Sequence, residues 1–185
     1  MLFHWIIDPI GFKFDYFLEA KEMSNETTIQ TNSLQKKWSV YLSGEIHTNW
    51  RDQISLGIQK NHLPVITMSP VTDHASSDDC GVHILGPEKL DFWKDSKGAK
   101  LNSIRNKTLI NHADIVIVKF GEKYRQWNAA FDAGYSIAMN KPLITIHPPE
   151  FSHALKEIDA ASLAVTDTPE KVIDILLYVT NGTLR

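Results

Sequence analysis

The sequence predicts an α/β domain built on a doubly wound sheet of five parallel strands with helices on both faces. Five short runs are rich in Val and Ile and are apolar at successive positions, which is typical of strands covered on both sides. Segments with apolar residues at helical spacing alternate with these runs, and such alternation is the pattern of parallel sheets. The length of 185 residues fits one such domain with an appendage and is too short for two full-sized domains.

The predicted strands and helices follow one another along the second part of the chain. The predicted strands are residues 38–44, 63–69, 114–120, 142–147 and 162–166, and the predicted helices are residues 49–61, 98–112, 124–140 and 168–180. The last helix has clear boundary signals, with Thr168 as N-cap, Pro169 at the first helical position and Gly182 beyond its end. In the helix over 124–140, one stripe is predicted to face the sheet: Trp127, Ala130, Phe131, Gly134 and Ala138.

The chain divides into an N-terminal appendage over residues 1–37 and a domain over residues 38–182. Residues 24–37 are polar and aperiodic, which is typical of a linker. The appendage is predicted to be partly disordered, and its aromatic side chains are candidates for docking on the domain or on a partner. Its apolar opening has no basic start and no small-residue cleavage site, so a signal peptide is not expected.

Composition excludes several classes of protein. The sequence is 43% hydrophobic and 22% charged, which argues against global disorder. Its formal net charge of −3 excludes a broad electrostatic surface for polymeric nucleic acid. No apolar run approaches the ~20 residues that a membrane-spanning helix requires. The single cysteine, Cys80, excludes an intrachain disulfide and predicts a reducing, cytoplasmic compartment.

Sheets of this kind bind ligands at the carboxyl ends of their strands, near the point where the strand order reverses. Four connections are therefore candidates for the functional site, and they cover residues 43–50, 69–93, 120–132 and 147–154. The second is unusually long for a strand-to-helix connection, and long connections are often functional.

The first connection ends a buried strand and opens a helix. Gly44 permits a tight turn there, and Glu45 and His47 are candidates for bonding to a ligand. The segment has neither the G-x-G-x-x-G nor the P-loop pattern, so it does not predict dinucleotide or nucleoside-triphosphate binding of those kinds. An ordinary turn with a helix cap explains the same residues equally well.

The long connection is dense in side chains that bind metals in other proteins. Their spacing matches no zinc or calcium loop pattern, and adjacent aspartates are common in turns, so no metal is predicted. The residues in question are Asp73, His74, Asp78, Asp79, Cys80 and His83.

Two helices carry polar side chains toward the predicted cleft. Asn102 and Arg105 are candidates for binding a phosphate or hydroxyl, although a basic helix face is ordinarily solvated. Asp132 lies off the apolar stripe of its helix, one turn after Asn128. It is either a solvated surface carboxylate or, together with Asn128, a group that presents a carboxylate and an amide to a ligand. Periodicity does not choose between the two.

Four long segments resemble the YtoQ family, a group similar to nucleoside 2-deoxyribosyltransferases. They are residues 41–54 (YLSGEIHTNWRDQI), 69–81 (SPVTDHASSDDCG), 92–147 and 153–165 (HALKEIDAASLAV). The resemblance covers about residues 37–180 and is specific, because several long segments match in order. It implies a flavodoxin-like sheet, a homo-oligomer whose active sites are completed by neighbouring subunits, and cleavage of a nucleoside N-glycosidic bond.

In the wider transferase family a glutamate attacks the C1′ carbon of the sugar, and the resemblance places Asp132 at that position. An anion is needed there because the transition state resembles an oxocarbenium ion. Aspartate is one methylene shorter, and misplacing a reacting atom by about 1 Å can lower the rate on the order of 100-fold. The departure therefore bears directly on the rate of any such reaction.

The family's two supporting aspartates are replaced here by Asn106 and Gln126. These amides can orient a base by hydrogen bonds, but they cannot act as a general acid toward the leaving nitrogen. If an acid is needed, Glu45, Asp73 and His47 are the nearest candidates by topology.

The leading hypothesis is an enzyme that cleaves or transfers at the N-glycosidic bond of a nucleoside, a nucleotide or a related ribosyl compound. Asp132 is the expected nucleophile or electrostatic stabiliser, and Asn128 is expected to orient the sugar. Trp93 or Tyr124 is expected to stack on the base, with Asp73 and His74 approaching from the long connection. No cofactor is expected.

Two other classes of function stay open. One is a non-catalytic protein that binds a nucleoside or nucleotide on the same fold, as the missing carboxylates suggest. The other is a metal-dependent hydrolase built on Asp73, His74 and Asp78.

Overall fold

A computed structural model of the chain describes residues 36–123 and 126–184. The predicted appendage over residues 1–37 therefore lies almost entirely outside the described residues, and so does Tyr124. The domain boundary at residues 37 and 38 stays a prediction.

The described residues form a five-stranded, all-parallel sheet, which confirms the predicted α/β class. The strands are β1 (Trp38–Gly44), β2 (Val65–Met68), β3 (Ile115–Lys119), β4 (Leu143–Ile146) and β5 (Ala164–Thr166). Their order in the sheet is β2-β1-β3-β4-β5, with every neighbouring pair parallel. The order reverses between β1 and β3, so ligands are expected at the carboxyl ends of these two strands.

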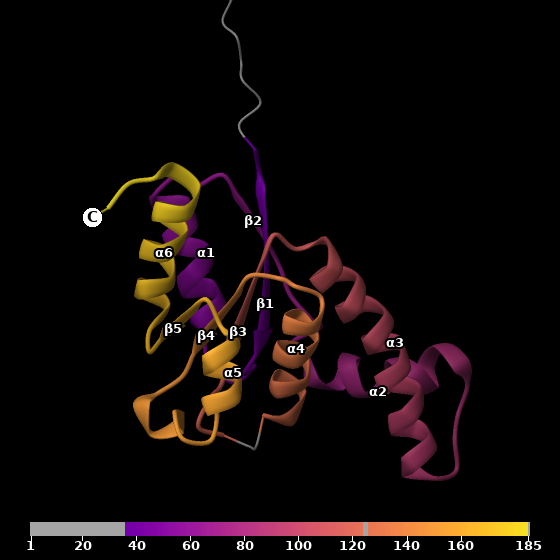
Figure 1. The fold of residues 1–185 in the computed structure, drawn as a ribbon. Helices are drawn as coiled ribbons and strands as arrows, with labels where there is room; N and C mark the ends of the chain where they lie inside the picture. The colour runs from indigo at the N-terminus through magenta and orange to yellow at the C-terminus, as the bar shows by residue number, and fades with distance from the viewer. Residues whose placement is uncertain (1–35, 124–125, 185) are drawn as a thin grey trace, which may run out of the picture. The chain divides into compact units, whose positions relative to one another are not determined.

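Helices cover both faces of the sheet (Figure 1). Helices α1 (Trp50–Lys60) and α6 (Pro169–Asn181) pack on one face. Helix α4 (Trp127–Ala138), helix α5 (Lys156–Ala161) and the C-terminal end of α3 (Asp91–His112) pack on the other. Neither the short helix α5 nor the preceding 3₁₀ turn, Pro149–Phe151, is signalled by the periodicity of the sequence.

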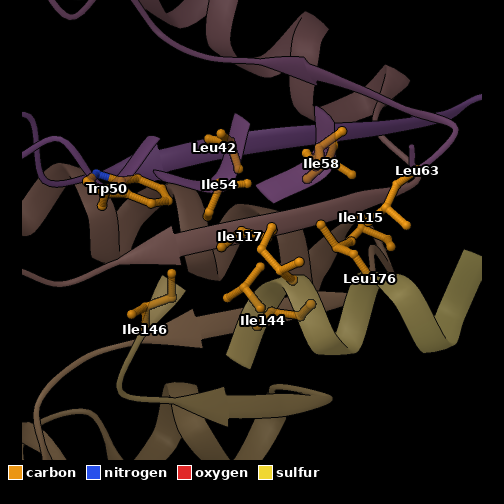
Figure 2. Packing of buried hydrophobic residues seen from close by; sticks show 13 residues of the cluster. Leu42, Trp50, Ile54, Ile58, Leu63, Ile115, Ile117, Ile144, Ile146 and Leu176 are labelled. Carbon is orange, nitrogen blue, oxygen red and sulfur yellow. The ribbon is translucent and has the colours of Figure 1, made fainter. Parts of the chain in front are cut away.

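The larger core lies between the sheet and helices α1 and α6. Figure 2 shows its aliphatic side chains, with Trp50 at one edge of the group, and the side chain of Trp50 is completely buried. Each strand sends alternate side chains into this core, because successive residues of a strand point to opposite faces. The residues labelled there are Leu42, Trp50, Ile54, Ile58, Leu63, Ile115, Ile117, Ile144, Ile146 and Leu176.

On the opposite face, α4 presents a side different from the predicted one to the sheet. Its buried residues are Ala129, Asp132, Ala133 and Ser136, whereas Trp127 and Phe131 of the predicted stripe are exposed. The prediction of that stripe is wrong, because it followed the largest apolar side chains. Small residues allow a helix to approach a sheet closely. The side of α4 that carries its small residues therefore faces the sheet.

The long connection after β2 contains a helix that the sequence analysis did not predict, α2 (His74–Leu85). Helix α3 also begins at Asp91 rather than at residue 98. The buried residue of α2 is Gly81, and a Cβ atom built on it would lie 2.2 Å from the backbone nitrogen of Gly98 in α3. A contact between two glycine backbones leaves no apolar stripe in the sequence, which explains why the periodicity missed this helix pair.

Asp114 joins the beginning of β3 to the beginning of β1. Its Oδ2 accepts hydrogen bonds from the backbone nitrogen of Ser39 at 2.8 Å and from the Ser39 hydroxyl at 2.9 Å, and its Oδ1 accepts one from Lys36 Nζ at 2.9 Å. These bonds, the backbone bond foremost, lower the pKa of Asp114 from 3.8 to about 2.

This carboxylate is expected to make stability depend on acid. Because its folded-state pKa is below the unfolded value, its contribution of about 2 kcal/mol is present above pH ~4 and is lost as the pH falls toward ~2. Asp114→Asn should therefore be about 2 kcal/mol less stable than the wild type at pH 6, with the gap closing at pH 2. Denaturant unfolding across this pH range measures the gap. A gap that is independent of pH would contradict the assignment.

Candidate active site

The candidate site lies at the carboxyl ends of β1 and β3, where the strand order reverses. Strand β1 ends in Ser43 and Gly44, and the chain then turns through Glu45 into α1. Helix α4 packs on the face of the sheet over β1 and β3 and places Asp132 against Ser43 of β1.

Asp132 and Ser43 form a buried pair. The Ser43 hydroxyl donates a hydrogen bond of 2.5 Å to Oδ2 of Asp132. Ser43 is 1% exposed and Asp132 is 9% exposed, so the carboxylate is largely removed from water. Burial raises the pKa of Asp132 above its usual value, and the hydrogen bond from Ser43 opposes that rise. Of the two alternatives that the sequence left open, the solvated surface carboxylate is therefore excluded.

Tyr41 lies two residues before Ser43, on the same side of β1. Its side chain is completely buried, and its hydroxyl has no hydrogen-bond partner among the described residues. Burial raises the pKa of Tyr41, and the nearby charge of Asp132 raises it further, whereas Arg51 and Arg105 act in the opposite direction. The phenol is thus neutral and shares the low-dielectric surroundings of Asp132.

The turn after β1 depends on two glycines. Gly44 has φ of +100°, and a Cβ atom at this position would lie 2.0 Å from the carbonyl oxygen of Lys119 in β3. A Cβ atom at Gly121 would lie 2.1 Å from Cγ of Glu45. Both close approaches require glycine, which confirms the tight turn expected at Gly44.

The carboxylate of Glu45 accepts hydrogen bonds from groups of the turn itself. It accepts hydrogen bonds from the backbone nitrogen of His47, from the backbone nitrogen of Thr48 at 3.2 Å and from the Thr48 hydroxyl. Burial alone would raise the pKa of Glu45, but the bonds from Thr48 and His47 and the charge of Lys119 outweigh burial and lower it. Glu45 is therefore ionised and bonded, which suits a residue that shapes the turn better than one that supplies a proton.

Arg51 and Trp50 hold the other side of this turn. The guanidinium of Arg51 donates to three backbone oxygens, those of Leu42 at 3.2 Å, Gly44 at 3.1 Å and Glu45 at 2.6 Å. The indole nitrogen of Trp50 also donates to the Glu45 oxygen, at 2.8 Å. Burial lowers the pKa of Arg51 to about 10, so the guanidinium stays charged near neutral pH.

The predicted residues of the long connection make hydrogen bonds and contacts away from Asp132. Asp73 caps α2 by accepting from the backbone nitrogen of Ser76 at 2.8 Å, and His74 pairs with Asp78 at 2.9 Å. Trp93 is half exposed. It packs edge-to-face on the ring of Phe92.

The two polar residues of α3 bind backbone oxygens of the same connection. Asn102 Nδ2 donates to the backbone oxygen of Ser77 at 2.9 Å. Arg105 reaches the backbone oxygen of Ser69 at 3.4 Å and is near enough to lower the pKa of Tyr41. Asn102 therefore holds α2 on α3. Of the two residues, Arg105 is the one that lies toward the candidate site.

The described part of the chain offers no converging set of three His, Cys, Asp or Glu side chains for a metal ion. Asp73, His74 and Asp78 are exposed and have the partners given above. The geometry thus gives the metal-dependent hydrolase no support. Within residues 36–123 and 126–184, no helix is long and apolar enough to cross a membrane.

The residues at the two positions of the family's supporting aspartates lie on α3 and at the start of α4. Asn106 has a buried Oδ1 with no hydrogen-bond partner in the described residues. Gln126 precedes α4 in a left-handed conformation, with φ of +50°, and its Nε2 donates to the backbone oxygen of Lys123 at 2.6 Å. Asn128, one turn before Asp132, is exposed.

Sequence reasoning missed Ser43 and Tyr41, although a signal for them was present. Both are polar side chains two residues apart in a strand predicted to be buried on both faces, so both had to lie on one face within the protein. Buried polar groups normally have a hydrogen-bond partner, and for Ser43 that partner is Asp132.

Comparisons with known proteins agree with this fold. A family model described as "Nucleoside 2-deoxyribosyltransferase YtoQ" matches residues 41–180. The uncharacterized protein YtoQ of Bacillus subtilis (strain 168) is 42% identical over 140 residues, which are 76% of this chain and 95% of that protein.

Two solved structures are similar in fold at low sequence identity. One is a conserved protein from Enterococcus faecalis V583, at 9% identity and a TM-score of 0.52, covering 76% of this chain and 98% of that one. The other is a 2-deoxyribosyltransferase from Bacillus psychrosaccharolyticus, at 15% identity and a TM-score of 0.47, covering 74% and 90%. On the family model and the Bacillus subtilis relative, the chain belongs to the nucleoside 2-deoxyribosyltransferase YtoQ family.

Proposed function

We propose that this protein cleaves or transfers at the N-glycosidic bond of a nucleoside, a nucleotide or a related ribosyl compound, with Asp132 as the nucleophile. The observation that carries the proposal is the buried Asp132 carboxylate, which Ser43 holds at the carboxyl end of β1. Membership of the family supplies the class of substrate.

The reaction proceeds in two displacements. The Asp132 carboxylate forms a bond to C1′ of the sugar as the bond from C1′ to the base nitrogen breaks, and the base leaves with that electron pair. Water or a second base then forms a bond to C1′, the carboxylate leaves with its own electron pair, and the proton of the attacking water or base passes to the solvent. A buried anion suits the first step, because it is poorly solvated and stabilises the positive charge that develops on the sugar.

The proton that the leaving base requires has no evident donor among the residues at the family's acid positions. Asn106 and Gln126 cannot ionise, and Glu45 is held ionised in the turn. A base that is cationic within the substrate leaves as a neutral molecule and needs no proton. We therefore expect cationic N-ribosides to react faster than neutral nucleosides of the same sugar.

The test is a panel of nucleosides, nucleotides and cationic N-ribosides, incubated with the full chain and free bases and followed by chromatography of the released base. We expect release from at least one member of the panel, and release that is slower by about a thousandfold or more with Asp132→Asn. Saturable binding without release, unaffected by Asp132→Asn, would replace the proposal with the binding-only alternative.

Cys80 is the chain's single cysteine and is a free thiol, which supports action in the reducing cytoplasm.

We also propose that the protein is a homo-oligomer. The arm, defined as α2 with the N-terminal part of α3 over residues 74–97, carries a group of apolar side chains that are each at least half exposed: Ile84, Leu85, Leu90, Phe92 and Trp93. In Figure 1 the free end of the arm lies away from the sheet. Ile104 of α3 and the aromatic residues Trp127 and Phe131 of α4 are also exposed.

A second copy of this chain is the partner that we expect to cover these exposed apolar side chains. At roughly 100 Å² for each side chain, the arm offers roughly 500 Å² of apolar surface and Ile104, Trp127 and Phe131 offer roughly 300 Å². An interface that uses both groups therefore reaches about the 800 Å² that each partner buries in a stable complex. Light scattering on a sizing column should give a dimer or larger for the wild type. The double variant Phe92→Glu, Trp93→Glu should elute as a folded monomer. A monomeric wild type at about 100 μM, well above typical interface dissociation constants, would contradict the proposal.

A further inference from the structure

We propose that Ser43 is a positioning residue that holds the Asp132 carboxylate by one oxygen and leaves the other oxygen for the sugar carbon. The inference rests on the proposed function and adds to it a residue of β1. Among the described residues, the Ser43 hydroxyl is the one group that hydrogen-bonds the carboxylate, and it reaches Oδ2.

The sheet itself places the Ser43 hydroxyl. Ser43 is paired with Val118 in the parallel ladder between β1 and β3, the central pair at the point where the strand order reverses. Its side chain is 1% exposed and points to the face that α4 covers. A donor fixed on a central strand keeps its direction better than a donor on a loop would.

Helix α4 fixes the other end of the pair. Ala129 and Ala133 on its buried side allow the helix to approach the sheet, and the Ser136 hydroxyl donates to the backbone oxygen of Asp132 at 2.7 Å. Asp132 therefore has its backbone held within the helix and one carboxylate oxygen held by the sheet. An aspartate has two side-chain torsions, so these two attachments leave the second oxygen little freedom.

This arrangement explains how the shorter carboxylate can serve at this position. An aspartate cannot reach as far as a glutamate, so its productive position has to be built by the approach of the helix and kept by a fixed contact. Ser43 also donates to the charged form of the carboxylate, which favours ionisation against the effect of burial. The same hydroxyl thus sets both the direction and the charge of the carboxylate.

The experiment compares Ser43→Ala with Ser136→Ala. Both substitutions remove one buried hydroxyl beside Asp132, but Ser43 bonds the carboxylate and Ser136 bonds the backbone oxygen. The first readout is the titration of the Asp132 carboxyl carbon by NMR without substrate. The second is the pH profile of kcat/KM on whichever substrate the panel identifies.

In Ser43→Ala, we expect the Asp132 titration and the acidic limb of the profile to move upward together by about one pH unit, and kcat to fall about tenfold or more. Ser136→Ala should leave the titration and the acidic limb where they are. Ser43→Cys keeps a donor at this position, although a weaker one on a larger atom, and it should shift both readouts in the same direction by less.

An unchanged Asp132 titration in both Ser43 variants, or an equal shift in Ser136→Ala, overturns the positioning role. The titration needs no substrate, so it separates this inference from the proposed function. If the titration shifts as expected but the wild type turns over no member of the panel, the proposed function fails and the Ser43–Asp132 bond stands.

Discussion

Replacing Asp132 by asparagine is expected to lower glycosidic turnover by about a thousandfold or more, because an amide cannot form the bond to the sugar carbon. Asparagine has nearly the same volume as aspartate, and its amide oxygen can still accept the hydrogen bond from Ser43. The fold should therefore survive, so thermal unfolding and base release are measured on the same preparation.

Two further variants make this result specific. Asp132→Glu keeps the charge but lengthens a side chain that is packed against β1, and we expect it to retain less than about a tenth of the activity, since a displacement of about 1 Å is costly for a reacting atom. Asp52→Asn neutralises an exposed carboxylate in the first turn of α1 and should change nothing. More than a tenth of the wild-type rate in Asp132→Asn would contradict the nucleophile assignment.

Gly44→Ala is expected to destabilise the domain by about 2–6 kcal/mol. The added Cβ atom would lie 2.0 Å from the Lys119 carbonyl oxygen, in a backbone conformation with φ of +100° that side chains rarely adopt. Strained backbone costs about 1–3 kcal/mol, and forcing a group into a packed core adds about 1–3 kcal/mol. Activity should fall as well, because β1 has to shift and carries Ser43 with it.

Gly86→Ala is the matched control for this substitution. Gly86 also has a positive φ, of +90°, but a Cβ atom there would meet nothing within 4 Å. Gly86→Ala should therefore lower the free energy of unfolding by the cost of the backbone strain alone, about 1–3 kcal/mol. Denaturant unfolding of both variants gives the difference. Equal losses in the two variants would mean that the contact with Lys119 is not the reason for glycine at position 44.

The sheet could be predicted from the sequence because its three central strands, β1, β3 and β4, are covered on both faces. A strand of that kind needs apolar side chains at nearly every position, and β3 has them at every position but its last, Lys119. Helix α2 and the first turns of α3 were not predicted, because their packing does not depend on apolar side chains. Their contact is made by the backbones of Gly81 and Gly98, which carry no periodic apolar signal.

For the candidate site, the sequence predicted the position of Asp132 but not its surroundings. The resemblance to a family marked the residue, whereas periodicity placed the large residues Trp127 and Phe131 on the sheet side. The structure instead buries the side of α4 that carries the small residues, and the Asp132 carboxylate lies on that side. Which side of a helix faces a sheet depends on how closely the two can pack, and a single sequence does not report that distance.

Isolating the covalent intermediate tests the central claim most directly. The full chain is quenched in acid during turnover of a substrate that the panel has identified, digested and analysed by mass spectrometry. We predict that the peptide containing Asp132 gains the mass of the sugar, and that a second base or water removes it when quenching is delayed. Steady turnover in which that peptide never gains mass, while Asp132→Asn remains active, would contradict the account.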